Sequence, residues 1–167
     1  EACGFIDRHQ QHPFFLYLPF NAVHNPMDPP EKYIAPFAPM KDEKRRKFAA
    51  MLTALDSGVG SILGKLNEHD LTNNTLVIFI SDNGGPTAQT TSNNGPLRGF
   101  KTQVLEGGIR VPFMMQWPGH IRPDQTYSEP VISLDILPTI VAAAGGELVA
   151  SDKCDGSDLV PYLALND

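Results

Sequence analysis

The sequence lacks the features that mark several common functional classes. Its 167 residues carry 13 basic and 19 acidic side chains, a formal net charge of −6, with no block of like charges. Because binding to a phosphate backbone requires a basic face, we expect no nucleic-acid partner. The longest apolar runs, residues 14–20 and 76–80, are far shorter than the roughly 20 residues that span a bilayer, so we also expect no membrane segment.

Cysteine is also scarce, and two familiar catalytic motifs are absent. Cys3 and Cys154 allow one disulfide or none, which leaves the redox compartment open. No Gly-x-x-x-x-Gly-Lys-Ser/Thr phosphate loop and no Gly-x-Ser-x-Gly nucleophile elbow occurs. What is present is the composition of a globular domain, with 41% hydrophobic residues. Residues 1–9 have helical spacing but no N-cap and no initiator methionine, so we expect a piece of a longer protein.

The order of the expected elements favours an α/β fold with a mostly parallel central sheet flanked by helices. Residues 42–69 place apolar side chains on one face of a helix, and glycines 58 and 60 within it indicate close packing. The β-branched run 75–81 predicts a central strand of a parallel sheet, and 111–117 predicts another strand. The run 14–18 predicts a strand buried on both faces.

Two further segments contain proline at informative positions. Residues 19–39 include six prolines, which predicts a long ordered loop of the kind that often serves function. A second helix is expected over residues 133–144, ending at Gly145, although Pro138 lies within it.

Candidate site residues follow two of the expected strands. Asp82 and Asn83 come directly after 75–81, and their oxygens suit a hard cation such as Ca²⁺ or Mg²⁺; the alternative is a plain turn. His24 follows 14–18 at the same expected edge of the sheet, where it can bind an oxyanion or act as a general acid. Its alternative is a loop histidine that only makes a hydrogen bond.

A third candidate segment, residues 94–112, combines spaced glycines with basic side chains. Arg98, Lys101 and Arg110 together with backbone amides could cradle a tetrahedral anion. The alternative is that Arg98 or Arg110 pairs with Glu106 to hold an irregular loop. We favour pairing for Arg110 and Glu106, and anion binding for Lys101.

In order and spacing, these segments resemble the sulfatase family, the formylglycine-dependent branch of the alkaline-phosphatase superfamily. The resemblance covers nearly the whole chain and is carried by Phe14-Phe-Leu-Tyr-Leu with His24-x-Pro, Ile-Ser-Asp82-Asn83-Gly-Gly, Gly95-Pro-Leu-Arg-Gly-x-Lys101 with Glu106-Gly-Gly-Ile-Arg-Val-Pro, Trp117-Pro-Gly and Asp135-Ile-Leu-Pro-Thr. It implies part of an alkaline-phosphatase-like sandwich, with residues 1–167 as a partial catalytic domain.

The resemblance also implies a set of residue roles. Asp82 and Asn83 would be two ligands of a calcium ion, or of Mg²⁺, while His24 and Lys101 would bind the sulfate oxygens and act near the leaving group. Glu106, Arg110 and Asp135 are expected to be structural. Phe100 departs from the family pattern, where a second glycine often precedes the lysine, and it could narrow the pocket.

The larger departure from the family is an absence. Neither cysteine lies in the Cys/Ser-x-Pro-x-Arg motif that yields the formylglycine nucleophile, and the family's first aspartate pair is missing. We therefore expect the isolated chain to be inactive and to need the N-terminal part of the same protein.

For the full-length protein, the resemblance implies hydrolysis of sulfate esters of carbohydrates or aryl alcohols in the periplasm, a lysosome or outside the cell. The alternatives are a phosphoester or phosphonate hydrolase of the same superfamily and a non-catalytic calcium- or glycan-binding fragment.

Overall fold

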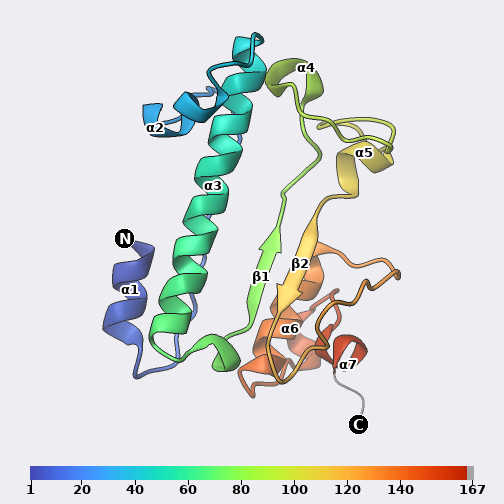
Figure 1. Cartoon of the computed structure of the whole chain (residues 1–167). Helices are drawn as coiled ribbons and strands as arrows, with labels where there is room; N and C mark the ends of the chain where they lie inside the picture. The colour runs from blue at the N-terminus through green and yellow to red at the C-terminus, as the bar shows by residue number, and fades with distance from the viewer. Residues whose placement is uncertain (165–167) are drawn as a thin grey trace. The chain divides into compact units, whose positions relative to one another are not determined.

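The computed structural model describes residues 1–164 and divides them into two compact units. The first unit contains residues 1–71 and 79–113, and the second contains residues 72–78 together with those from 114 onward. The elements, labelled in Figure 1, are α1 (Ala2–His9), α2 (Glu31–Ile34), η1 (Ala35–Phe37), α3 (Glu43–Glu68), η2 (Thr72–Asn74), β1 (Val77–Ile80), α4 (Thr87–Thr90), α5 (Glu106–Ile109), β2 (Phe113–Gln116), η3 (Ser133–Asp135), α6 (Ile136–Ala143), η4 (Ala150–Asp152) and α7 (Val160–Leu163). No helix in the described part of the chain combines the length and the apolar character needed to cross a membrane.

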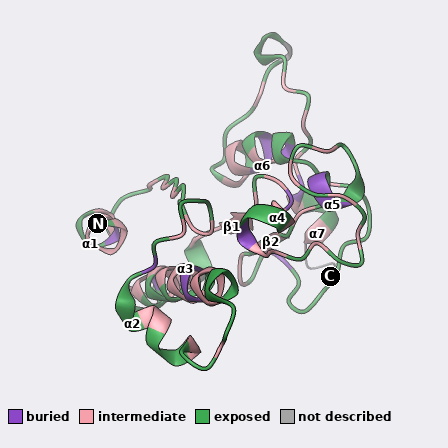
Figure 2. Cartoon of the chain, turned by 90° about the horizontal axis from the view of Figure 1, so that it is seen from above, coloured by how far each residue is buried: buried purple, intermediate pink, exposed green. Residues whose placement is uncertain are grey.

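The long helix α3 is the framework of the first unit, and its predicted bounds are confirmed. It begins after Asp42, whose carboxylate accepts a hydrogen bond from the Arg45 backbone amide at 3.0 Å and so satisfies one free donor of the first turn. Both α1 and α2 pack on α3. Ile6 of α1 and Ala50, Met51 and Leu66 of α3 form the buried core there, and Figure 2 shows how few other residues are buried.

Gly58 and Gly60, two of the three glycines of α3, have different surroundings. A Cβ on Gly58 would lie 3.3 Å from a ring carbon of Phe20, so the prediction of close packing is confirmed at this position. A Cβ on Gly60 would have no neighbour within 4 Å, so the prediction is wrong there.

The two strands form one sheet and run in opposite directions (Figure 1). Beyond β1 the pairing continues, because the Ser81 amide donates to Pro112 O at 3.1 Å and the Gly84 amide donates to Gly108 O at 2.9 Å. As residue numbers rise on one side they fall on the other, which is the antiparallel pattern. The mixture of helix and strand is confirmed, whereas a parallel neighbour of β1 is not found among residues 1–164.

Two sequence-based expectations in the first unit need correction. Residues 14–18 form no strand, because no described segment pairs with them. They are not buried on both faces either: Phe15 and Tyr17 are 70% and 75% exposed, while Phe14, Leu16 and Leu18 are partly buried. The segment 19–39 is not all loop, since α2 begins after Pro30 and Pro36 lies in the first turn of η1. Proline is tolerated in a first turn because the amide it lacks would have no helical partner there.

The expected second helix lies in the second unit and starts with a tighter turn. The 3₁₀ turn η3 leads into α6, which ends before Ala144. Pro138 is the third residue of α6, so it also occupies a first turn and does not break the helix. Asp135, which is buried, accepts hydrogen bonds from the Ile132 and Ser157 amides at 2.8 and 2.9 Å. This fixes Asp135 as a structural residue, as predicted.

Cys3 and Cys154 are both free thiols.

Candidate functional site

His24 and Lys101, which are 77 positions apart in the sequence, meet in the first unit. His24 Nε2 lies 3.1 Å from Lys101 Nζ, and His24 Nδ1 lies 2.6 Å from the carbonyl oxygen of Asn25. A carbonyl oxygen only accepts, so Nδ1 donates the proton and Nε2 presents its lone pair to the Lys101 ammonium. His24 is exposed and Lys101 is partly buried. No carboxylate of the described residues forms an ion pair with either side chain, so the positive charge of the pair is available to an anion.

Asp82 and Asn83 follow β1 after a single residue, Ser81. The Asn83 amide nitrogen donates to Asp82 Oδ2 at 2.6 Å, and Ser81 Oγ donates to the Asn83 carbonyl oxygen at 3.0 Å. With its nitrogen used in this way, the Asn83 amide leaves its oxygen as an acceptor beside a carboxylate. Two neighbouring oxygens of these types fit a hard cation, and Ca²⁺ takes 6–8 such ligands. The donor set of this chain is therefore suitable in kind for calcium but supplies only part of a coordination shell.

Gly84 and Gly107, which lie near these residues, pack closely against other segments of the backbone. A Cβ on Gly84 would lie 1.8 Å from Gly107 O, and one on Gly107 would lie 2.3 Å from Gly99 O. Gly99 has φ +101°, a conformation that favours glycine. The amides of Gly107 and Gly108 already donate to Arg98 O and Leu105 O, both at 2.7 Å. These two amides are therefore not free to bind a ligand.

Among the basic residues of this segment, Arg110 pairs with an acid as predicted. Arg110 Nη1 lies 3.4 Å from Glu106 Oε2, one turn apart along α5, and both side chains are exposed. An exposed pair of this kind contributes little to stability. Arg98 is also exposed, and its backbone oxygen, rather than its side chain, makes the contact with Gly107.

Asn94, which was not among the residues predicted from the sequence, makes three hydrogen bonds with its side chain. Its Oδ1 accepts from the Gly85 amide at 2.8 Å, while its Nδ2 donates to Gly85 O at 2.9 Å and to Gly99 O at 3.2 Å. The only sequence signal is its position before the Gly95-Pro96 turn, which is common for asparagine in any loop.

A charged cluster between α1 and α3 was missed as well. The Asp7 carboxylate accepts from His69 Nε2 at 2.7 Å and pairs with Lys65 Nζ at 3.2 Å, and Lys65 also pairs with Glu68 at 2.7 Å. Hydrogen bonds from His69 and then from Lys65 hold the pKa of Asp7 below its usual value, while bonds to Glu68 and Asp7 raise the pKa of Lys65. Asp7, Glu68 and His69 have the right atoms for a cation, but the Lys65 ammonium already pairs with the carboxylates of Asp7 and Glu68. The cluster is therefore an ion-pair network that joins two helices.

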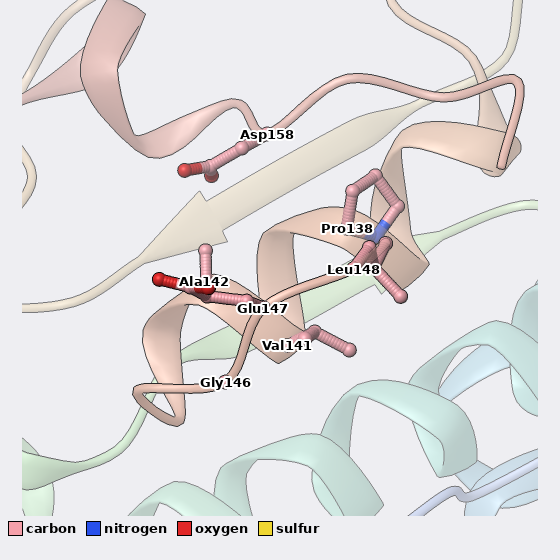
Figure 3. Close-up of a pocket in the computed structure, with 7 residues that line it drawn as sticks. All are labelled: Pro138, Val141, Ala142, Gly146, Glu147, Leu148 and Asp158. Atoms are coloured by element: carbon pink, nitrogen blue, oxygen red, sulfur yellow. The ribbon is translucent and has the colours of Figure 1, made fainter. Parts of the chain in front are cut away.

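The second unit contains a separate pocket of about 310 Å³ beside α6 (Figure 3). Pro138, Val141 and Ala142 of α6 form one side, and Asp158 lies on the other. Glu147 and Asp158 are its two charged residues. None of the four candidate residues lines it, so it is not part of the site described above.

Comparison with known proteins gives one consistent family. The family model for sulfatases matches residues 1–146. Steryl-sulfatase of Rattus norvegicus is 36% identical over 170 aligned positions, which cover 98% of this chain and 28% of the relative. The uncharacterized sulfatase YdeN of Escherichia coli (strain K12) is 34% identical, and the match covers 98% of this chain and 30% of the relative. The chain thus spans less than a third of these two curated relatives.

Solved structures agree with this result. The crystal structure of Ps i-CgsB in complex with k-i-k-neocarrahexaose is 38% identical with a TM-score of 0.91, and the match covers 96% of this chain and 36% of that one. A Bacteroides thetaiotaomicron protein, solved in work on glycosaminoglycan metabolism, is 27% identical with a TM-score of 0.74; the match covers 96% of this chain and 35% of that one. The likeness to these solved structures confirms the α/β class and the alkaline-phosphatase-like fold.

Proposed function

Because the chain belongs to the sulfatase family, we propose that the protein containing it hydrolyses sulfate esters and that His24, Lys101, Asp82 and Asn83 are this chain's part of the active site. The observation that carries the proposal is the contact of 3.1 Å between His24 Nε2 and Lys101 Nζ. Two basic nitrogens held together, with no ion pair to a carboxylate among residues 1–164, attract an oxyanion such as a sulfuryl group.

Lys101 and His24 have complementary tasks in this proposal. The ammonium of Lys101 is a compact point charge with three donors, of which one faces His24 and the others can bind sulfuryl oxygens. The Asn25 carbonyl fixes the ring of His24, so Nε2 is directed at Lys101. A proton shared between Nε2 and Nζ can then pass to the bridging oxygen as the alcohol leaves.

Asp82 and Asn83 would hold a calcium ion, or Mg²⁺, together with ligands from outside this chain. The bound cation would supply positive charge against the sulfuryl oxygens. The nucleophile would also come from outside, as a formylglycine, because the chain contains no Cys/Ser-x-Pro-x-Arg motif. We therefore propose that residues 1–167 form a partial catalytic domain and that the isolated chain does not turn over sulfate esters.

Carbohydrate or aryl sulfates are the proposed substrates. A solved relative that was crystallised with a neocarrahexaose supports the carbohydrate class. Phe100, which is 41% exposed and adjacent to Lys101, would restrict the alcohol side of the pocket. An environment outside the cytosol, in the periplasm, a lysosome or the extracellular space, is proposed from the same family membership.

The test compares a chromogenic aryl sulfate with the matching aryl phosphate, using the complete protein that contains this chain. We expect hydrolysis of the sulfate that is lost with a chelator and restored by Ca²⁺, and at least about 10²-fold less with His24→Ala. Faster hydrolysis of the phosphate would favour the phosphoesterase alternative. Calcium binding without turnover of either ester would favour a non-catalytic role, and turnover by the isolated chain would contradict the proposed incompleteness.

A further inference from the structure

The three hydrogen bonds of Asn94 connect the two loops that contain the proposed site residues. Gly85, which it bonds through both backbone groups, is two positions after Asn83, and Gly99 is two positions before Lys101. The side-chain amide of Asn94 thus links the loop that contains Asp82 and Asn83 to the loop that contains Lys101. Both of its N–H donors and its oxygen are used.

The hydrogen bonds between Asn94 and Gly85 depend on a close approach of the two segments that contain these residues. A Cβ on Gly85 would lie 2.3 Å from Ser92 Oγ, so the backbone passes close to the segment that contains Asn94. Asn94 itself is partly buried, which protects its hydrogen bonds from exchange with water. No other side chain among residues 1–164 makes hydrogen bonds to both loops.

Backbone contacts hold the same loops at other points. The Gly84 amide donates to Gly108 O, and the Gly107 amide donates to Arg98 O. Removal of the Asn94 side chain should therefore leave both loops folded, although each loop loses its hydrogen bonds to Asn94. A positioning effect can then be measured without general unfolding.

We infer that Asn94 is a positioning residue that sets the Asp82–Asn83 metal ligands relative to Lys101 through the backbone of Gly85 and Gly99. This inference rests on the proposed function, because it assumes that those side chains act together. All three of its hydrogen bonds are to backbone groups, so the role inferred for Asn94 is an indirect one. Its effect is that of an outer-shell partner of a metal ligand, whose loss costs about 10- to 100-fold in metal affinity or activity.

The test uses Asn94→Ala and Asn94→Asp in the complete protein. Alanine removes all three bonds, and aspartate keeps the acceptor for the Gly85 amide but loses both donors. Asn93→Ala is the matched control, because Asn93 is the neighbouring asparagine and its Oδ1 accepts a hydrogen bond from the local Gly95 amide at 2.8 Å. The readouts are the Ca²⁺ dissociation constant by calorimetry, kcat and KM separately, the melting temperature, and hydrogen exchange of the Gly85 amide.

We expect both Asn94 variants to bind Ca²⁺ about 10-fold more weakly or to lose kcat by a similar factor, and Asn94→Ala to exchange the Gly85 amide faster. The control should remain within about twofold. Losses that match only a smaller folded fraction, or values within twofold of wild type, would overturn the inference.

Asp82→Ala separates this inference from the proposed function. If Asp82→Ala weakens Ca²⁺ binding and the Asn94 variants do not, only the positioning role fails. If Asp82→Ala leaves Ca²⁺ binding unchanged, the proposed metal site fails, and with it the positioning role that depends on that site.

Discussion

The first unit contains two neighbourhoods in which a histidine and a lysine lie close together, and the two differ in their contacts with carboxylates. Lys65 and His69 both contact the Asp7 carboxylate, and Lys65 contacts Glu68 as well. Lys101 and His24 contact each other, and no ion pair to a carboxylate is found for either in the described residues. In the first neighbourhood the charges are compensated and join two helices. In the second they are uncompensated, which is the state that an anion-binding site requires.

Removal of each lysine gives the largest expected contrast. Lys101→Ala should lower kcat of the complete protein by at least about 10²-fold, which corresponds to about 2.7 kcal/mol of transition-state stabilisation. The reason is that the substitution removes the positive charge of the ammonium that stabilises the sulfuryl oxygens. Lys65→Ala should leave kcat unchanged and lower only the melting temperature. Steady-state kinetics and thermal unfolding of both variants check this. Equal kcat in the two variants would remove the distinction between the neighbourhoods.

Glycine substitutions test how rigidly the loops of the site are packed in comparison with α3. Gly84→Ala should destabilise the protein by about 1–3 kcal/mol, because its Cβ would collide with the Gly107 carbonyl and overpacking forces the backbone to move. Gly60→Ala should be neutral or stabilise by up to about 1 kcal/mol, because alanine favours the helix and nothing lies within 4 Å. Denaturant unfolding measures both changes. A neutral Gly84→Ala would show that the loops can shift without cost.

The elements that could be predicted from the sequence are those with a local cause. The apolar face and the Asp42 cap define α3, and the β-branched run defines β1. The strand β1 begins later and ends earlier than the predicted range 75–81. The run 14–18 was mispredicted because an apolar run does not say whether a partner strand exists. His24 and Lys101 were both candidates from the sequence, and the structure brings their side chains together, although their role stays a prediction. Asn94 and Asp7 could not be found from the sequence because their partners are distant in sequence or are backbone groups.

Acid titration of the compensated neighbourhood gives the smallest expected effect. The pKa of Asp7 is lowered by hydrogen bonds from His69 and Lys65, so the folded state binds this proton less readily than the unfolded state, whose value is near 3.8. The stabilisation is therefore fully present above that value and is lost as the pH falls through the lower folded pKa.

Asp7→Asn should thus lower the melting temperature at neutral pH and flatten its decline between about pH 5 and pH 2, while kcat at neutral pH is unchanged. Melting curves of both proteins across this range measure the difference. Parallel curves would mean that Asp7 keeps its charge-dependent contacts in the unfolded chain or never makes them. A change in kcat would mean that the two neighbourhoods are coupled through α3, and the contrast between a structural and an anion-binding pair would then no longer hold.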